Sequence, residues 1–383
     1  MERTLDINFP TNPVTGSGAA FLWGPRKTGK TTLLKMRYGQ ARWYDLLDTG
    51  LQTELILRPH LLREQILAET PELVVIDEIQ KVPALLDEVH WLLENTSTRF
   101  ILCGSSARQL RHGAANLLAG RAWRHELFPL TTAEIADFDL DRALLHGTLP
   151  VHYLEDDPRR SLKAYVFEYL QEEIIHEALV RNVPSFARFL ENVALTHGRL
   201  LNYANLAREA GVTAKTVRAY YQILTDTLIG HALEPWTRRK KRRLIETAKY
   251  YLFDVGVANH LAGIEQLVPG TDTYGRAFEH FLLEQVRAWL AYRERDLPLY
   301  FWRTSTGFEV DLIVGDMHRA IEFKASSRIG QRDLRGLRAL MEDQPVGQAL
   351  LVCREDTPRR TSDGIDILPW AEFCRRLWND ELV

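Results

Sequence analysis

The sequence predicts an α/β protein of more than one domain, with a parallel sheet in its N-terminal third. Three short apolar runs, Ala19–Trp23, Leu73–Asp77 and Arg99–Cys103, alternate with stretches of helical character. Continuous apolar runs suit strands that are covered on both faces. A glycine-rich segment directly follows the first run, and a long amphipathic segment followed by further strand-like runs begins after Thr271. We therefore expect a parallel sheet first and a second sheet near the C-terminal end.

Size and composition indicate an ordinary globular protein. The chain has 383 residues, which is long for one core, with 45% hydrophobic and 26% charged residues, so we expect two or three domains. No apolar stretch approaches the roughly 18 residues of a membrane span, and the first six residues lack a signal peptide's apolar core. The cysteines are far apart, unlike those of zinc sites or disulfide frameworks. We expect a cytoplasmic protein with no membrane partner.

The net charge limits how nucleic acid could bind. A formal charge of −3 gives no global field that attracts polyanions. A DNA partner would therefore require a local basic surface.

The segment after the first predicted strand has the P-loop pattern of nucleotide-binding proteins. Its candidate nucleotide-binding residues are Gly24, Pro25, Arg26, Lys27, Thr28, Gly29, Lys30, Thr31 and Thr32. Glycines let backbone N–H groups turn toward phosphates at the start of a helix, where anions are already favoured. In this pattern Lys30 neutralises the β- and γ-phosphates and the Thr31 hydroxyl is a ligand of Mg²⁺. The expected cofactors are ATP and Mg²⁺.

Two other strand ends supply candidate catalytic groups. Asp77 and Glu78 end the second apolar run, where Asp77 would hold the magnesium through its waters and Glu78 would polarise the attacking water. An acidic pair at a strand end is commonly a solvated corner, but beside a P-loop it becomes specific. Ser105 or Ser106, after the third run, would be a polar sensor of the γ-phosphate or the attacking water.

Two arginines are candidates for an arginine finger. Arg121 and Arg124 follow the sensor position in the chain. A finger completes the nucleotide site of a neighbouring subunit, so this reading implies a homo-oligomer. A surface ion pair is the competing reading for either arginine.

A helix-turn-helix is predicted in the middle of the chain. A short helix over Asn202–Ala210 closes at Gly211, and a second over Thr213–Leu224 has Thr213 as its N-cap. The second helix of such a pair can enter a major groove. The candidate DNA-binding residues near its start are Lys215, Thr216 and Arg218.

The most basic tract of the chain follows this helix pair. It consists of Arg238, Arg239, Lys240, Lys241, Arg242 and Arg243. Strand-like segments, Leu228–Leu233 and Tyr250–Phe253, flank it, which is typical of a hairpin with a charged tip, the wing of a winged helix. Such a tip could meet several phosphates and bind DNA with little sequence preference. A solvated loop or a protein-docking domain is the alternative.

The C-terminal part places acidic groups and a lysine on neighbouring strands. Glu309–Val314 and Arg319–Lys324 are predicted strands joined by a turn at Gly315 and Asp316. Alternation puts Glu322 and Lys324 on one face, which Asp311 can also reach. Glu279 lies on the preceding amphipathic helix.

The whole series of motifs resembles a family of AAA+ ATPases of bacteria and archaea whose members carry a conserved C-terminal region. The matching segments are Gly24–Thr31, Leu73–Gln80, Gly104–Ser106, Gly120-Arg121, Leu127–Thr131, Tyr251–Gly256, Trp302–Asp311 and Ile321–Lys324. The similarity spans nearly the whole chain. It departs from common AAA+ practice in having serine where an asparagine sensor is usual.

The C-terminal constellation further resembles the PD-(D/E)XK nuclease fold. That resemblance implies that Asp311 and Glu322 are Mg²⁺ ligands, that Lys324 positions the water, and that Glu279 is a supporting acid. Many nuclease-like folds serve instead as binding or packing modules, so cleavage stays open.

The resulting expectation is an N-terminal P-loop AAA+ parallel sheet, a helical winged-helix middle domain and a C-terminal restriction-endonuclease-like α/β domain. The expected boundaries are 1–135 for the ATPase core, 136–190 for a helical lid, 191–268 for the winged helix and 269–383 for the nuclease-like domain. We expect an ATP-hydrolysing motor or remodeller of DNA. The alternative is a nucleotide-gated switch that binds a protein partner and has an inactive nuclease-like domain.

Overall fold

The structure of the chain is a computed structural model that describes residues 2–105, 118, 120–166, 182–237 and 244–382. The chain divides into two compact units. The N-terminal unit consists of residues 2–129 with 226–229, and the C-terminal unit of residues 130–225 with 230–383.

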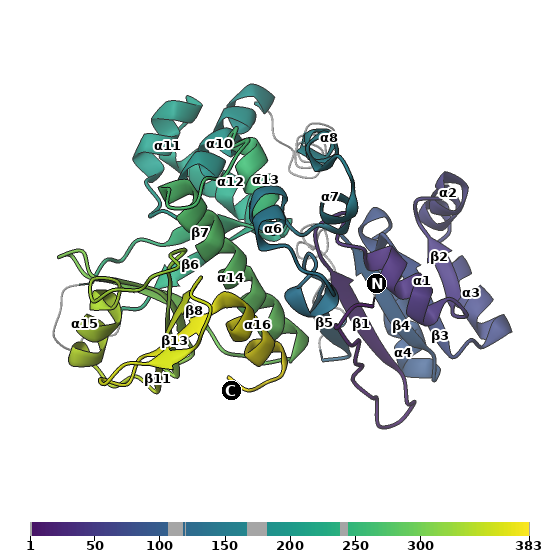
Figure 1. The fold of residues 1–383 in the computed structure, drawn as a ribbon. Helices are drawn as coiled ribbons and strands as arrows, with labels where there is room; N and C mark the ends of the chain where they lie inside the picture. The colour runs from purple at the N-terminus through teal and green to yellow at the C-terminus, as the bar shows by residue number, and fades with distance from the viewer. Residues whose placement is uncertain (1, 106–117, 119, 167–181, 238–243, 383) are drawn as a thin grey trace. The chain divides into compact units, whose positions relative to one another are not determined.

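The N-terminal unit alternates strands and helices along the chain (Figure 1). Its strands are β1 (Gly18–Trp23), β2 (Arg42–Asp45), β3 (Leu73–Asp77), β4 (Arg99–Gly104) and β5 (Ala122–Glu126). Its described helices are α1 (Lys30–Tyr38), α2 (Thr49–Leu57), α3 (His60–Glu69), the 3-10 turn η1 (Ile79–Lys81) and α4 (Leu85–Asn95).

These strands form one sheet in the order β2-β3-β4-β1-β5, and every pairing in it is parallel. Strands β1, β3 and β4 are almost entirely buried, as expected for strands covered on both faces. The N-terminal parallel sheet predicted from the sequence is confirmed. Because the strands run in the same direction, the loops after β1, β3 and β4 meet at one edge of the sheet.

The C-terminal unit begins with helices. They are the 3-10 turn η2 (Thr132–Glu134), α6 (Leu140–His146), α7 (Pro150–Leu154), α8 (Pro158–Ala164), α10 (Val183–Thr196), α11 (Tyr203–Ala210) and α12 (Ala214–Asp226). Helix α11 starts where Asn202 accepts a hydrogen bond from Asn205 N and ends at Gly211 in the left-handed conformation. Both boundaries agree with capping chemistry.

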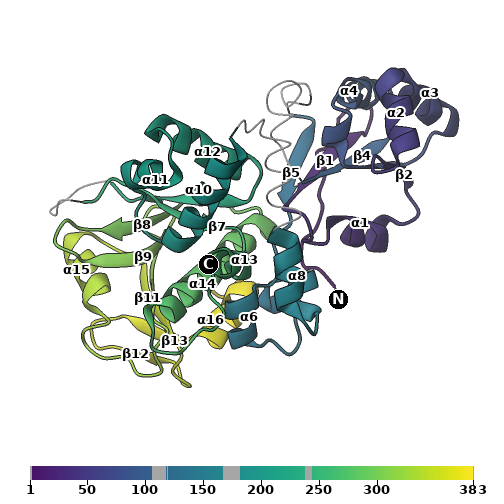
Figure 2. The same cartoon turned by 90° about the horizontal axis from the view of Figure 1, so that it is seen from above.

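A sheet of eight strands makes up the rest of this unit, in the order β12-β13-β11-β10-β9-β8-β6-β7. Its strands are β6 (Gly230–Pro235), β7 (Lys249–Leu252), β8 (Leu299–Arg303), β9 (Glu309–Val314), β10 (Arg319–Phe323), β11 (Gln348–Cys353), β12 (Arg359–Arg360) and β13 (Asp366–Pro369). Its helices are α13 (Val255–Leu261), α14 (Asp272–Tyr292), α15 (Arg335–Asp343) and α16 (Trp370–Trp378). Figure 2 shows α15 on one side of this sheet and α14 and α16 on the other.

The antiparallel hairpin β6–β7 follows the helix pair α11–α12, as the winged-helix prediction requires. It also joins the C-terminal sheet, because Glu234 and Pro235 of β6 pair in parallel with Tyr300 and Phe301 of β8. The expected boundary at 268/269 therefore falls inside a unit that shares one sheet. The winged-helix and nuclease-like interpretations, and the finer domain boundaries, stay predictions.

The segment Tyr251–Gly256 has a structural role in this unit. The buried Asp254 carboxylate accepts hydrogen bonds from Thr148 N at 2.8 Å and from Val257 N at 3.0 Å. It therefore caps α13 and ties it to the chain that leaves α6. Burial raises the pKa of Asp254 to about 6. A Cβ added at Gly147, whose φ is +77°, would lie 2.0 Å from Asp254 Oδ1.

Among the helices that the structure describes, none combines the length and the apolar character of a membrane-crossing segment. The three cysteines are buried free thiols.

Candidate functional site

The P-loop connects β1 to α1 at the carboxyl edge of the N-terminal sheet. Gly29 has a left-handed φ of 94° and is the N-cap of α1. A Cβ at Gly24 would lie 2.5 Å from the Leu127 carbonyl oxygen. Both positions therefore require glycine, one for its backbone conformation and one for close approach of two chain segments.

Two polar side chains of the loop are held where a phosphate and a metal would bind. Lys30 is buried, and its Nζ donates hydrogen bonds to Gly24 O at 2.7 Å and Pro25 O at 3.0 Å. The Thr31 hydroxyl donates to Asp77 Oδ2 at 2.7 Å. The loop, the lysine, the hydroxyl and the carboxylate form the donor set that fits a magnesium nucleotide.

The remaining loop residues differ in exposure. Arg26 is partly buried, Lys27 and Thr32 are exposed, and the buried Thr28 hydroxyl donates to Pro25 O at 2.8 Å. Lys27 has a left-handed φ of 64°. The exposed side chains of Lys27 and Thr32 leave them free to meet a ligand.

Arg3, in the N-terminal segment, holds the P-loop through hydrogen bonds that the sequence did not reveal. It is buried and donates to Thr28 O at 2.7 Å and to Phe128 O at 2.6 Å. It thereby ties the P-loop to the segment after β5.

The acidic residues at the end of β3 belong to a small polar network. Glu78 has a left-handed φ of 56°, and its N–H donates to Asp77 Oδ1 at 3.0 Å. Gln80 Nε2 donates to Glu78 Oε2 and, at 3.2 Å, to Ser105 Oγ. Ser105 Oγ also lies 3.5 Å from Glu78 Oε2. Glu78 and the candidate sensor Ser105 are thus joined, and Gln80, to which the sequence assigned no role, joins them. Ser106 lies outside the described residues.

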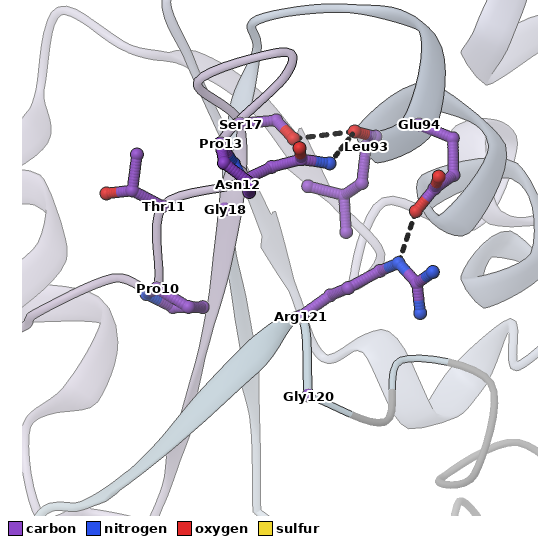
Figure 3. Close-up of a pocket in the computed structure, with 10 residues that line it drawn as sticks. All are labelled: Pro10, Thr11, Asn12, Pro13, Ser17, Gly18, Leu93, Glu94, Gly120 and Arg121. Atoms are coloured by element: carbon purple, nitrogen blue, oxygen red, sulfur yellow. Dashed lines mark hydrogen bonds and ion pairs between the residues drawn. The ribbon is translucent and has the colours of Figure 1, made fainter.

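The two arginine-finger candidates lie on or beside β5. Arg121 directly precedes this strand, and its side chain forms an ion pair with Glu94. Arg121 and Glu94 line a pocket of about 390 Å³ together with Asn12, Ser17 and Gly18 (Figure 3). Arg124 is exposed on the strand.

The register of β5 against β1 places Arg121 at the opposite edge of the sheet from the P-loop of its own chain. Ala122 pairs with Ala19 near the start of β1, and Glu126 pairs with Trp23 at its end. Arg121 therefore lies at the amino edge of the sheet, whereas the P-loop follows the carboxyl edge. A strand of this length separates the two edges by about 17 Å at 3.3 Å per residue.

The helix-turn-helix candidates lie at the start of α12. Lys215 and Arg218 are exposed, and the Arg218 guanidinium lies 5.0 Å from the centre of the Tyr203 ring. Thr216 is partly buried; its N–H donates to Thr213 Oγ1 at 3.1 Å, so Thr213 caps the helix as expected. The basic tract Arg238–Arg243 lies outside the described residues.

In the C-terminal unit, Asp311 and Glu322 lie side by side on β9 and β10. Antiparallel pairing sets Ile321 opposite Leu312, which brings the next pair, Glu322 and Asp311, together. Phe323 N donates to Asp311 Oδ2 at 2.8 Å. Both carboxylates are buried, with exposed fractions of 8% and 5%.

The lysine predicted to position water pairs with one of these acids. Lys324 Nζ forms an ion pair with Glu322 Oε1, and the Lys324 side chain remains 35% exposed. Glu322 Oε2 has no hydrogen-bond partner within the described part of the chain. A buried carboxylate oxygen without a partner is costly, and a cation beside it would remove that cost.

Burial and the neighbouring charges shift the pKa values of Asp311, Glu322 and Lys324. Burial, reinforced by the nearby Glu279 charge, raises the pKa of Asp311 to about 6. Burial and then Asp311 raise the pKa of Glu322 well above its ordinary value. Burial opposes the charged form of Lys324, yet Glu322 and Asp311 outweigh it and raise the pKa of the lysine. Buried carboxylates with shifted pKa values make this cluster a candidate functional site.

Glu279, the predicted supporting acid, contacts a lysine and a tyrosine of β7. Its Oε1 accepts from Lys249 Nζ at 3.0 Å and from the Tyr251 hydroxyl at 2.6 Å. Lys249 Nζ also lies 2.7 Å from Glu309 Oε1. The sequence assigned no role to Lys249, which comes from β7.

A metal at this site would rest on two protein carboxylates. Among the described residues, no group of three or more histidine, cysteine or acidic side chains is placed to hold a metal ion. Asp311 and Glu322 remain as the acidic pair, and Mg²⁺ is commonly bound by one or two carboxylates with waters and substrate phosphates. The pair with its unpartnered oxygen fits such an ion.

A second pocket, of about 660 Å³, begins next to Lys324. It is lined by Pro269, Gly270, Thr271, Gly275, Ala325, Ser326, Ser327 and Arg354. The hydroxyls and the guanidinium in its wall suit an anionic group.

Three family profiles match consecutive parts of the chain. Residues 17–136 match an AAA domain. Residues 137–268 and 274–373 match two domains of unknown function, DUF8612 and DUF4143.

Relatives of the whole chain are similar at moderate identity. Uncharacterized proteins of Mycobacterium bovis and Mycobacterium tuberculosis are each 28% identical over 371 residues, covering 94% of this chain and 82% of the relative. An uncharacterized protein of Haemophilus influenzae is 24% identical over 277 residues, covering 63% of this chain and 68% of its own length.

Two solved structures align with this chain at low TM-scores. The Orc1 protein of Aeropyrum pernix in complex with DNA aligns with a TM-score of 0.28 and 14% identity, over 64% of this chain and 86% of that one. A signal transduction ATPase with a tetratricopeptide repeat sensor from Pyrococcus horikoshii aligns with a TM-score of 0.22 and 13% identity, over 73% and 46%. The sequence match over residues 17–136, together with the parallel sheet and its P-loop, makes the N-terminal part of this chain an AAA+ ATPase-type domain.

Proposed function

We propose that this protein hydrolyses ATP with Mg²⁺ and uses it to act on DNA, as a motor or remodeller of the repair or recombination type. The observation that carries the ATPase part is the 2.7 Å hydrogen bond from Thr31 Oγ1 to Asp77 Oδ2. It joins the two groups that hold magnesium in P-loop enzymes. Glu78 lies next in the chain, where a carboxylate can polarise the attacking water.

Glu78 would be held for this task by its neighbours. Gln80 and Ser105 both contact the Glu78 carboxylate, which fixes its orientation. Lys30 would leave its two carbonyl partners and neutralise phosphate charge, since a phosphate is a stronger acceptor than a neutral carbonyl.

The oligomer is part of the proposal because of where Arg121 lies. At the amino edge of the sheet it is too far to reach the nucleotide of its own chain, so as a finger it would serve a neighbouring copy. Its partner Glu94 is 43% exposed and the Arg121 side chain 40% exposed, so the ion pair contributes little and its exchange costs little.

DNA binding rests on local positive charge. Lys215 and Arg218 are exposed near the start of α12, and the sequence places six basic residues at 238–243 in a chain of net charge −3. Contacts to phosphates by such groups release counterions and make binding sensitive to salt.

We also propose that Asp311 and Glu322 hold Mg²⁺ for cleavage of a phosphodiester. A magnesium ion there would supply Lewis-acid chemistry, while Lys324, paired with Glu322, would orient a water at the ion. The unpartnered Glu322 Oε2 supports this reading.

The test compares ATP turnover and DNA cleavage on linear, forked and four-way DNA. Lys30→Ala is expected to abolish turnover. Asp311→Asn should remove cleavage and spare turnover, whereas Asp316→Asn, on the exposed turn after β9, should change neither. Neutralising residues 238–243 should remove stimulation by DNA.

The switch alternative gives a different pattern. Turnover would be slow and indifferent to every DNA, and Asp311→Asn would have no measurable effect. Stimulation of the neutralised loop variant as strong as that of wild type would show that the basic tract is not the DNA contact.

A further inference from the structure

Lys249 is a buried lysine at the edge of the carboxylate site. Its side chain is only 4% exposed, and its Nζ lies 3.0 Å from Glu279 Oε1 and 2.7 Å from Glu309 Oε1. The ammonium also lies 5.4 Å from the centre of the Phe301 ring. Two carboxylates from different elements, α14 and β9, thus converge on one internal cation.

The backbone fixes this lysine in place. Lys249 pairs with Leu233 of β6 on one side and forms a bridge with Leu200 on the other. The Tyr251 hydroxyl, two residues along β7, donates to the same oxygen of Glu279 at 2.6 Å. The ammonium has little freedom to move away from the two acids.

The other lysine of the site differs in this respect. Lys324 pairs with Glu322 but is 35% exposed, so its side chain can turn toward solvent. A metal ion could displace Lys324 from Glu322, whereas Lys249 remains between Glu279 and Glu309.

Without the Lys249 ammonium, the Glu279 and Glu309 carboxylates would repel each other or bind a divalent cation. Nucleases that use two metal ions hold them about 3.5–4 Å apart. Here the acids for such a second position are already paired: Glu279 pairs with Lys249, and Glu309 pairs with Lys249 and, at 3.0 Å, with Arg303.

We propose that the Lys249 ammonium takes the place of a second divalent cation, so that the site binds a single ion on Asp311 and Glu322. This inference rests on the proposed magnesium site and defines its stoichiometry. Lys249 acts as a positioning residue, because it holds Glu279 and Glu309 and does not itself contact the ion.

The test is a calorimetric titration of the full chain with Mn²⁺ in the absence of nucleotide. Wild type is expected to bind about one Mn²⁺ per chain in a manner that requires Asp311. Lys249→Met is expected to bind about two, because Glu279 and the Glu309 oxygen that faced Lys249 become available to a further ion, while Arg303 stays on Glu309 Oε2. Lys249→Arg keeps the charge and should stay at about one. Lys249→Met combined with Glu279→Gln removes a freed ligand and should also return to about one.

The outcomes separate the inference from the proposed function. If wild type shows no Mn²⁺ binding that Asp311→Asn removes, the proposed metal site is wrong. If that binding is present but Lys249→Met binds the same number of ions, the metal site stands and the role of Lys249 is wrong.

Folding of Lys249→Met provides a second readout, because the substitution leaves buried acids without a counterion. Mn²⁺ should raise its melting temperature more than that of wild type, since an added ion replaces the lost charge. If the variant is unfolded in metal-free buffer, its circular dichroism should recover in Mn²⁺. Failure to recover, or an equal shift in both proteins, would contradict the proposal.

Discussion

The hydroxyl of Thr31, in the first turn of α1, donates a hydrogen bond to the carboxylate of Asp77, at the end of β3, 46 residues away in the chain. This contact joins the P-loop to the acidic strand end at the carboxyl edge of the parallel sheet. The neighbouring Glu78 is then aligned by Gln80 and Ser105.

Glu78→Gln should separate nucleotide binding from hydrolysis. The amide keeps the shape of the side chain but cannot polarise water, so turnover should fall by about 100-fold or more. ATP affinity should stay near that of wild type, because Glu78 is not placed to bind phosphate. Steady-state kinetics and nucleotide binding measure the two quantities; an equal loss of both would assign Glu78 to binding instead.

Gln80→Ala should slow hydrolysis without weakening ATP binding. It removes a hydrogen bond that orients Glu78 and leaves Ser105 as the remaining described partner of that oxygen, which should lower kcat by roughly tenfold, about 1.4 kcal/mol. KM should change little. Lys81→Ala, in the same short turn η1, is the matched control and should resemble wild type. A normal kcat for Gln80→Ala would mean that the network does not position Glu78.

Gly147→Ala should destabilise the contact between α6 and α13. A methyl group there would lie 2.0 Å from Asp254 Oδ1, at a φ of +77°, so clash and backbone strain add to about 3 kcal/mol or more. Gly263→Ala has a similar φ of +69° but open space around it, and should cost only about 1 kcal/mol. Hydrogen exchange of the α6 and α13 amides should be faster in Gly147→Ala than in wild type. Equal exchange in the two variants would show that Asp254 does not hold α6 and α13 together.

The buried histidines of the C-terminal unit should destabilise it in acid, whereas the buried Asp254, whose pKa is raised, makes the opposite contribution. Burial lowers the pKa of His280 to about 4 and those of His197 and His231 well below the ordinary value. An unfolded histidine binds its proton near pH 6.5, whereas the folded one does so only near its depressed pKa. The stability from each histidine is therefore present above pH 6.5 and lost as pH falls toward the folded pKa, at up to about 1.4 kcal/mol per pH unit.

His280→Gln isolates this effect. The glutamine amide can replace the His280 Nε2 contact with Leu252 O and does not titrate. As pH falls from 6.5 to 4, the variant should therefore lose less unfolding free energy than wild type does. Denaturant unfolding at several pH values measures the slopes, and identical slopes would show that His280 is not buried as described.

The sequence predicted the buried strands best. Ala19–Trp23 was expected where β1 spans Gly18–Trp23, and Glu309–Val314 coincides with β9. Ala19–Trp23 is a continuous apolar run, which suits a strand covered on both faces, and Glu309–Val314 is followed by a turn and a partner strand. β5 was not predicted: it is an edge strand with polar and exposed residues, among them Trp123 at 45% exposure, and an edge strand requires no apolar run.

The predicted strand Leu228–Leu233 begins later than expected, at Gly230. Leu228 has a left-handed φ of 60°, a conformation outside the extended region. Hydrophobicity alone does not reveal such a local turn.

The site residues that the sequence missed are defined by distant partners. Arg3 reaches Phe128, 125 residues away, and Lys249 reaches Glu279, 30 residues away. Motif spacing identifies groups on one loop or one strand pair, such as Lys30 with Thr31 or Asp311 with Glu322. It carries no information about a side chain that enters the site from another part of the chain.

We propose above all that a magnesium nucleotide binds where the loop from Gly24 to Thr31 meets Asp77. The most direct test is equilibrium binding of ATP to wild type, Lys30→Ala and Lys35→Ala, with and without Mg²⁺; Lys35 is an exposed lysine of the same helix. We predict that wild type and Lys35→Ala bind ATP at millimolar concentrations or below and more tightly with Mg²⁺, and that Lys30→Ala does not. Wild-type protein that fails to retain ATP with Mg²⁺, or Lys30→Ala that binds it equally well, would contradict the account.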